Sequence, residues 1–202
     1  MKEVAAISQT RNAIDKRQVI LEAAIRAFAR SGYHQTRITD VAQEAGVAAG
    51  TIYLYFKRKD DLLITIFQEK VEGFVSEFRW QLSQEKSAEG KLRKLIHQHL
   101  SEMQNHANLA AVFQLELRQS RHFMSAYPKV DLKAYFDLIG EIIEEGQHQG
   151  LFRQDLYVSV VKKALFGALD EMVTSWLLAG KGYDLVRMAG PLADLFVRGL
   201  QE

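Results

Sequence analysis

Helical periodicity runs almost without interruption along this chain of 202 residues. Only two prolines occur, Pro128 and Pro191, and the 13 glycines are scattered. Apolar residues recur at three- and four-residue spacing, and no alternating apolar pattern is joined by hairpin turns. The pattern predicts an all-α chain of about nine helices without a sheet.

The expected helices follow from the apolar stripes and from the residues that end or cap a helix. Ser87 and Asp155 are expected N-caps, and Pro191 should kink the last helix or restart it at a first-turn position. The first helix carries Ile20 to Phe28 on its apolar face and ends at Ser31-Gly32. The others are expected at about residues 38–45, 49–55, 60–82, 87–104, 108–119, 132–150, 155–179 and 184–200.

Composition excludes several classes of protein. Cysteine is absent, so disulfides, thiolate metal sites and cysteine nucleophiles are excluded. No apolar run approaches the roughly 20 residues that cross a bilayer, and residues 1–18 lack the apolar region of a secretory signal. We therefore expect a soluble cytoplasmic protein that does not insert into a membrane.

Charge is unevenly distributed. Residues 1–60 hold 10 Lys and Arg against 6 Asp and Glu, net +4, whereas the other 142 residues hold 16 against 19, net −3. A basic first third hints at a patch for polyanions, although chance asymmetry explains it equally well.

Residues 36–59 predict a helix-turn-helix. A short helix, a tight turn at Gly46 and a second short helix place Val47, Ile52 and Phe56 inward, while small residues allow the two helices to cross closely. Small and hydroxylated groups on the outer face of the second helix suit a major groove, and the basic residues after it suit phosphates. The spacing alone also fits an ordinary helical hairpin with a solvated basic end.

The identities of the residues in this segment are more specific than their spacing. Its motifs are Gly32-Tyr33, Val41-Ala42, Ala45-Gly46-Val47, Gly50-Thr51-Ile52-Tyr53, Tyr55-Phe56 and Lys59-Asp60-Asp61-Leu62. Together they resemble the N-terminal domain of the TetR family of repressors. The resemblance implies a homodimer on a palindromic double-stranded operator, with a DNA-binding domain at 1–60 and a ligand-binding and dimerisation domain at 61–202.

Two positions depart from the family pattern. Arg37 stands where Ser or Thr is frequent, so the cap of the first helix must come from Thr36 or from nothing. Ala48 stands where Ser is frequent, which removes an N-cap worth about 1 kcal/mol from the second helix.

The resemblance also implies roles for single residues. Lys59 resembles the family lysine that meets a backbone phosphate, and Tyr53 resembles the tyrosine that donates its hydroxyl to phosphate. A basic segment with Arg11, Lys16 and Arg17 either enters the minor groove or forms a disordered tail. The other expected DNA-binding residues are Arg37, Thr39, Ala49, Gly50, Thr51, Tyr55 and Lys57.

The remaining helices offer apolar and aromatic surface with polar groups among it, around Gln114 and Asp170. Such groups suggest an internal network or a ligand. With Tyr183-Asp184-Leu185-Val186 and Tyr33-His34-Gln35, these segments look similar to the acyl-CoA-responsive repressors of fatty-acid degradation in Gram-positive bacteria. That subgroup implies a long-chain acyl-CoA as effector and no cofactor; the alternative is a multidrug-type sensor of other lipophilic ligands.

An acyl-CoA needs an apolar tunnel that ends at cations. Arg118 and Arg121 are the candidates for the phosphates, although both also fit a solvated helix end. Gln114 and Asp170 are the polar candidates inside the domain. The candidates for the acyl tail are Phe113, Leu117, Ile139, Phe166, Leu169 and Trp176.

An enzyme or a metal site has little support in the sequence. His97 and His99 diverge on a helix, unlike the i, i+4 pair of a helical zinc site, and each histidine is expected at the surface or in helix packing. Neither a glycine-rich phosphate loop nor a Gly-x-Ser-x-Gly elbow occurs.

The last two helices are expected to form the dimer interface as a four-helix arrangement. The dimer would place two DNA-binding domains about 34–36 Å apart, in successive major grooves. One helix contributes small residues and the other an apolar stripe: Val160, Ala164, Gly167, Ala168 and Ser175, and Met188, Leu192, Leu195, Phe196 and Leu200.

Overall fold

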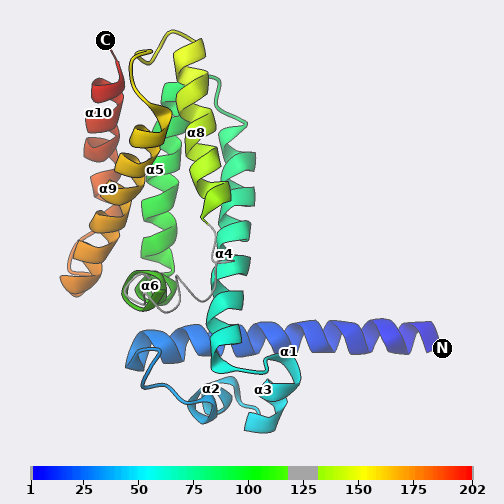
Figure 1. Ribbon diagram of the computed structural model, residues 1–202. Coiled ribbons are helices and arrows are strands. Elements are labelled where there is room, and N and C mark those ends of the chain that lie inside the picture. Colours follow the sequence, from blue (N-terminus) through cyan, green and yellow to red (C-terminus); the bar gives the residue numbers. More distant parts are fainter. Residues whose placement is uncertain (1, 118–131, 202) are drawn as a thin grey trace. The chain divides into compact units, whose positions relative to one another are not determined.

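The computed structural model describes residues 2–117 and 132–201 (Figure 1). These residues form nine α-helices, one π-helical segment and one 3-10 turn, with no strand among them. The predicted all-α class is therefore confirmed. The chain divides into two compact units, residues 1–67 and 68–202, and the division falls inside helix α4 (Lys59–Leu82).

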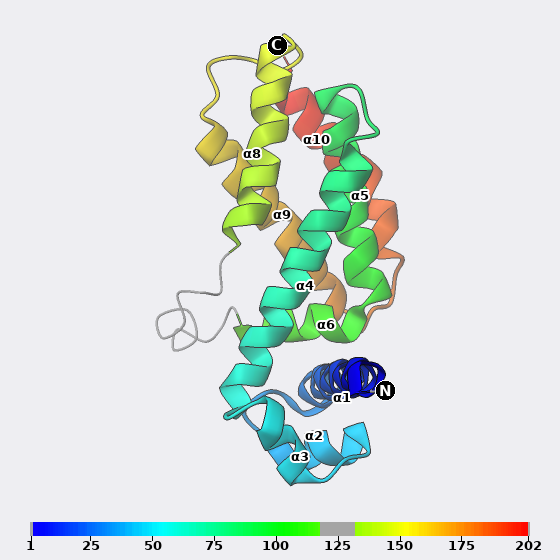
Figure 2. The ribbon, with the colours of Figure 1, turned by 90° about the vertical axis from the view of Figure 1, so that its right-hand side faces the viewer.

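The first unit contains α1 (Lys2–Ser31), α2 (Ile38–Ala45), α3 (Ala49–Tyr55) and the start of α4. Helix α2 packs against both α1 and α3, and Figures 1 and 2 show α2 and α3 on the same side of α1. Gly46 ends α2 with φ of 66°, a left-handed conformation that glycine adopts without a steric penalty. The short turn between α2 and α3 thus follows the prediction.

The N-terminal segment differs from both alternatives considered for it. Residues 2–18 continue α1 rather than form an arm or a tail. The Arg17 guanidinium lies 5.5 Å from the centre of the Phe56 ring, so this cation packs within the unit.

The cap of α2 also differs from the expectation. The Asp40 carboxylate accepts a hydrogen bond from the Arg37 backbone N–H at 2.7 Å, whereas the Thr36 hydroxyl bonds to the Gly32 carbonyl oxygen at 2.7 Å. The cap therefore comes from the third residue of the helix, as in half of a capping box. Ala48 supplies no side-chain cap to α3, as predicted.

The second unit contains the rest of α4 and the helices that follow it (Figure 2). Helix α9 packs against α5, α6, α8 and the π-helical segment, and α10 packs against α5. The elements are α5 (Ala88–Asn105), α6 (Ala107–Ala111), the π-helical η1 (Val112–Leu117), α8 (Lys133–His148), α9 (Val158–Leu178), the 3-10 turn η2 (Leu185–Met188) and α10 (Ala189–Leu200).

The predicted helix ends are partly confirmed in this unit. Ser87 caps α5 by accepting a hydrogen bond from the Gly90 N–H at 3.1 Å. Pro191 lies in the first turn of α10, which starts anew after η2. Asp155 is wrong as a cap, because α9 begins at Val158 and the Asp155 carboxylate pairs with Arg153.

Candidate nucleic-acid interface and ligand site

Helix α3 has one buried face and one open face. Ile52 is fully buried, and Phe56, directly after the helix, is 4% exposed. Gly50 and Leu54 lie two residues to either side of Ile52, which places them on the opposite side of the helix. Leu54 is 81% exposed and Tyr53 is 54% exposed. The helix therefore presents an open surface whose position is fixed by its buried side.

The predicted DNA-binding residues lie between Arg37, which precedes α2, and Lys59, the first residue of α4. The residues that are exposed are Arg37, Thr39, Gly50, Tyr53 and Lys57. The residues that are partly buried are Ala49, Thr51, Tyr55 and Lys59. The arrangement brings all nine onto consecutive elements of one unit, as a helix-turn-helix requires.

Lys59 is engaged inside its unit. Its ammonium donates to the backbone oxygens of Tyr33 at 2.7 Å and Thr36 at 3.0 Å, and it lies 4.2 Å from the centre of the Tyr33 ring. The Tyr33 hydroxyl donates to the Asp60 carboxylate. These contacts fasten the start of α4 to the segment between α1 and α2. A phosphate contact of Lys59 stays a prediction.

An ion-pair cluster joins α2 to α1. The Glu44 carboxylate accepts hydrogen bonds from Arg26 at 2.8 Å and from Arg30 at 2.9 Å. These two guanidinium groups lower the pKa of Glu44. The carboxylate and both guanidinium groups are partly exposed to solvent, so these ion pairs add little to the stability of the fold. Their main effect is to orient α2 against α1.

Leu54 is an exposed residue of α3 that the sequence prediction did not include. It lies four residues after Gly50, so the helical period itself places it on the outer face. An exposed aliphatic group on such a helix can contact the methyl group of thymine.

The predicted acyl-tail residues lie on three packed elements of the second unit. Ile139 on α8 and Leu169 on α9 are fully buried. The partly buried Phe166 ring lies 4.9 Å, centre to centre, from Phe136. Phe113 on η1 is partly buried, and η1 packs against α9. These groups belong to one continuous apolar interior.

The polar candidates of the same region are buried and connected. Gln114 and Asp170 are each 8% exposed. The Thr174 hydroxyl lies 2.9 Å from the Asp170 backbone oxygen and 3.3 Å from Gln114 Oε1. The Thr174 hydroxyl thus lies between the Gln114 side chain on η1 and the Asp170 backbone oxygen on α9.

Three ligand candidates are not described, and a fourth makes a hydrogen bond within its own unit. The Leu117 side chain, Arg118 and Arg121 lie outside the described residues. Trp176 is 3% exposed, and its ring N–H donates to the Tyr183 backbone oxygen at 2.9 Å. This bond joins the end of α9 to the segment before η2, and a ligand contact of Trp176 stays a prediction.

An aromatic cluster with one histidine is the feature that the sequence prediction missed. His99 on α5 contacts Tyr135 on α8, with 2.7 Å between His99 Nδ1 and the Tyr135 hydroxyl oxygen. Burial lowers the pKa of His99 to about 4 and raises the pKa of Tyr135. The signal was present, because His99 follows the inward residues Leu95 and Ile96 at helical spacing. His97, by contrast, is exposed, so the two histidines diverge as predicted.

The described part of the chain lacks a cluster of metal ligands and a helix that could span a membrane. It contains no group of three or more His, Asp or Glu side chains arranged to hold a metal ion. None of its helices combines the length and the apolar character that crossing a membrane requires.

Family models match both units. The model described as "Bacterial regulatory proteins, tetR family" matches residues 20–66, and the model described as "YsiA-like protein, C-terminal region" matches residues 67–199. The border between the two matches falls within one residue of the division between the two compact units.

Individual proteins resemble the chain along most of its length. It is 38% identical over 181 residues to the fatty acid metabolism regulator protein of Bacillus subtilis, covering 90% of this chain and 93% of that protein. The crystal structure of the transcriptional regulator FadR from Bacillus subtilis in complex with stearoyl-CoA matches with a TM-score of 0.86 and 37% identity, over 92% of this chain and 100% of that one. The fatty acid degradation regulator FadR from Bacillus halodurans matches with a TM-score of 0.87 and 40% identity, over 92% and 96%.

The low pKa of His99 predicts a loss of stability in mild acid. As the pH falls below about 6.5, the unfolded chain takes up a proton at His99, whereas the folded chain does so only near pH 4. Between pH 7 and pH 5 this difference should lower the free energy of unfolding by about 2 kcal/mol. Urea unfolding of the wild type and of His99→Phe at both pH values measures it. The wild type should lose about that much more than the variant; parallel losses would contradict the prediction.

Proposed function

We propose that this chain, which belongs to the TetR family of bacterial transcriptional regulators, represses genes of fatty-acid degradation in the cytoplasm. It binds a palindromic operator as a homodimer, and a long-chain acyl-CoA releases it. The observation that carries the proposal is the likeness of both units, over most of the chain, to fatty-acid regulators. The chain is accordingly a regulator and not an enzyme.

The open face of α3 supports DNA binding. Gly50 and Thr51 leave little bulk on the first turn, so the helix can approach the base edges of a major groove closely. Tyr53 is exposed and carries a hydroxyl for a phosphate oxygen, and the exposed Lys57 follows the helix. Phosphate contacts then set the position of α3, while its small residues meet the bases.

Two substitutions separate these roles. Tyr53→Phe should weaken binding to every sequence by about tenfold, because one hydrogen bond to phosphate is lost. Thr51→Ala should instead reduce the difference in affinity between selected and random DNA. Selection from a random-sequence duplex library provides the operator, and fluorescence anisotropy at physiological salt provides the affinities.

Tyr157→Phe is the matched control for the hydroxyl, because Tyr157 is 78% exposed in the second unit. It should bind the selected operator like the wild type. Equal affinity of the wild type for selected and random DNA would end the repressor proposal.

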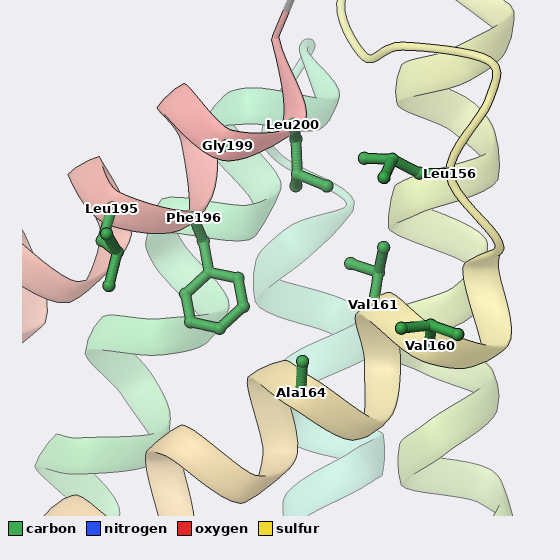
Figure 3. A pocket seen from close by; sticks show the side chains of 8 residues that line it. All are labelled: Leu156, Val160, Val161, Ala164, Leu195, Phe196, Gly199 and Leu200. Carbon is green, nitrogen blue, oxygen red and sulfur yellow. The ribbon is translucent and has the colours of Figure 1, made fainter.

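The last two long helices carry an exposed apolar surface that supports the homodimer. A hollow between α9 and α10 is lined by eight residues, and the side chains of Phe196, Val161 and Ala164 face it (Figure 3). Val160 is 60% exposed and Leu195 is 68% exposed at its edges. Small exposed residues on α9 permit close approach of a second copy. The full lining is Leu156, Val160, Val161, Ala164, Leu195, Phe196, Gly199 and Leu200.

Not every residue of the predicted stripe is available to a second copy. Leu192 and Leu200 are 5% and 4% exposed, so both pack inside their own protomer. A charge at Leu192 would therefore unfold the chain rather than split a dimer. Leu195 is the informative position.

Leu195→Glu should convert the dimer to a monomer that keeps its fold, because the carboxylate would be buried without a partner only in the dimer. Its thermal unfolding should remain a cooperative transition, as expected of a folded monomer. Leu54→Glu is the matched control, since Leu54 is 81% exposed in the first unit. Sedimentation equilibrium should show a monomer for Leu195→Glu and a dimer for Leu54→Glu; an unchanged dimer in both would place the interface elsewhere.

The interior of the second unit supports an acyl ligand. Rings from α4, α8 and α9 meet there, and the buried Ile139 and Leu169 extend the apolar surface. The structural relative from Bacillus subtilis holds stearoyl-CoA, whose long acyl chain is the kind of group that such an interior accommodates. Arg118 and Arg121 remain the candidates for the phosphates of CoA.

Titration of the operator complex identifies the effector. Stearoyl-CoA should release the DNA, whereas CoA alone should not, because the ligand acts only through its different affinity for the two states. A tenfold loss of operator affinity requires about 1.4 kcal/mol of coupling. Stearic acid and a cationic dye are the comparison ligands. Release by the dye without a response to stearoyl-CoA would favour a multidrug-type sensor and contradict the proposal.

A further inference from the structure

His99 on α5 joins a chain of aromatic rings that come from three other helices, α4, α8 and α9. Its ring centre is 5.6 Å from that of Tyr135 on α8. The Tyr135 ring in turn lies 6.3 Å from Phe78 on α4 and 6.0 Å from Phe166 on α9. The imidazole is thus a polar group set into the same apolar interior as the predicted acyl-tail residues.

One nitrogen of this imidazole is unpaired within the described part of the chain. Nε2 of His99 is out of contact with solvent and has no hydrogen-bond partner among the residues that the structure describes. Buried polar atoms in native proteins are nearly always paired, because an unpaired one keeps the full cost of its desolvation. An orphaned atom of this kind points to a partner that enters with a ligand.

The contact with Tyr135 determines what that partner must be. A neutral imidazole carries one ring proton, and the phenol keeps its own proton because burial raises the pKa of Tyr135. If the hydroxyl donates to Nδ1, the ring proton resides on Nε2, and the pair leaves a single unpaired donor. If Nδ1–H instead donates to the phenol oxygen, Nε2 lacks a donor and the phenol hydrogen lacks an acceptor. Nε2–H is therefore a donor that lacks an acceptor among residues 2–117 and 132–201.

We propose that His99 Nε2–H donates a hydrogen bond to the thioester carbonyl oxygen of the acyl ligand, and that Tyr135 is the positioning residue that holds the imidazole in this form. This inference rests on the proposed binding of acyl-CoA. In such a ligand the thioester carbonyl is the acceptor nearest to the chain, and the chain beyond it has no polar atom. His99 suits this junction, because the residue as a whole is only partly buried while Nε2 is closed off from water.

A pair of ligands that differ only at the carbonyl tests the proposal. Stearoyl-CoA and its thioether analogue S-octadecyl-CoA are titrated into the full-length protein without DNA, with calorimetry as the readout. The wild type should bind the thioester about tenfold more tightly, which corresponds to about 1.4 kcal/mol and to one hydrogen bond. In His99→Phe the preference should vanish, because the ring remains and the donor is lost.

Three further variants sharpen the measurement. His99→Gln carries an amide N–H near the position of Nε2 and should recover part of the preference. Tyr135→Phe keeps its ring, loses the bond that fixes the imidazole, and should reduce the preference to about threefold. His97→Phe is the matched control, since His97 is exposed on the same helix, and it should leave both affinities unchanged.

The outcomes distinguish this inference from the proposed function. A tenfold preference that survives in His99→Phe, or that is missing from the wild type, overturns the role of His99 and leaves acyl-CoA binding in place. If the wild type binds neither ligand, both proposals are overturned. Should His99→Phe fail to fold, Tyr135→Phe decides the matter, and an undiminished preference in that variant overturns the inference.

Discussion

The burial of Ile52 is the contact on which the exposed surface of the first unit depends. Helix α3 has seven residues, whereas isolated helices shorter than about 12–15 residues are marginal in water. Ala48 provides no side-chain cap, so local hydrogen bonds do not compensate for the short length. The order of α3 must come from Ile52 and Phe56, which are buried to 0% and 4% exposure. Every exposed group of α3 is held in place by these two side chains.

The sequence predicted the helices well because an inward apolar stripe is a local property of the chain. Gly46 and Pro191 were predictable for the same reason, because the backbone conformation that each favours is a property of the residue itself. The errors occurred where two local interactions compete. Asp155 could have capped α9, but its carboxylate pairs with Arg153, and α2 takes its cap from Asp40 rather than from Thr36. Spacing alone does not rank such alternatives.

The candidate sites were predictable to the extent that they follow helical period. The outer face of α3 follows from the inward position of Ile52, and the same helical period places the apolar Leu54 on that face. His99 was expected at the surface or in helix packing, but its contact with Tyr135 on another helix could not be predicted from spacing. The contacts of Lys59 join residues 23 and 26 positions apart. Such contacts depend on the tertiary fold and leave no periodic signal in the sequence.

A neutral donor in an apolar interior distinguishes between ligands by their charge. Because burial lowers the pKa of His99 to about 4, the imidazole is uncharged near neutral pH and offers a carboxylate no opposite charge. A buried carboxylate beside it would lose its hydration without forming an ion pair, which is costly. A thioester carbonyl is uncharged and gives up little hydration for one hydrogen bond. If His99 binds the thioester as proposed, the His99 and Tyr135 pair would favour an activated acyl group over the ionised free acid, and the polarity of the interior would help to distinguish the two.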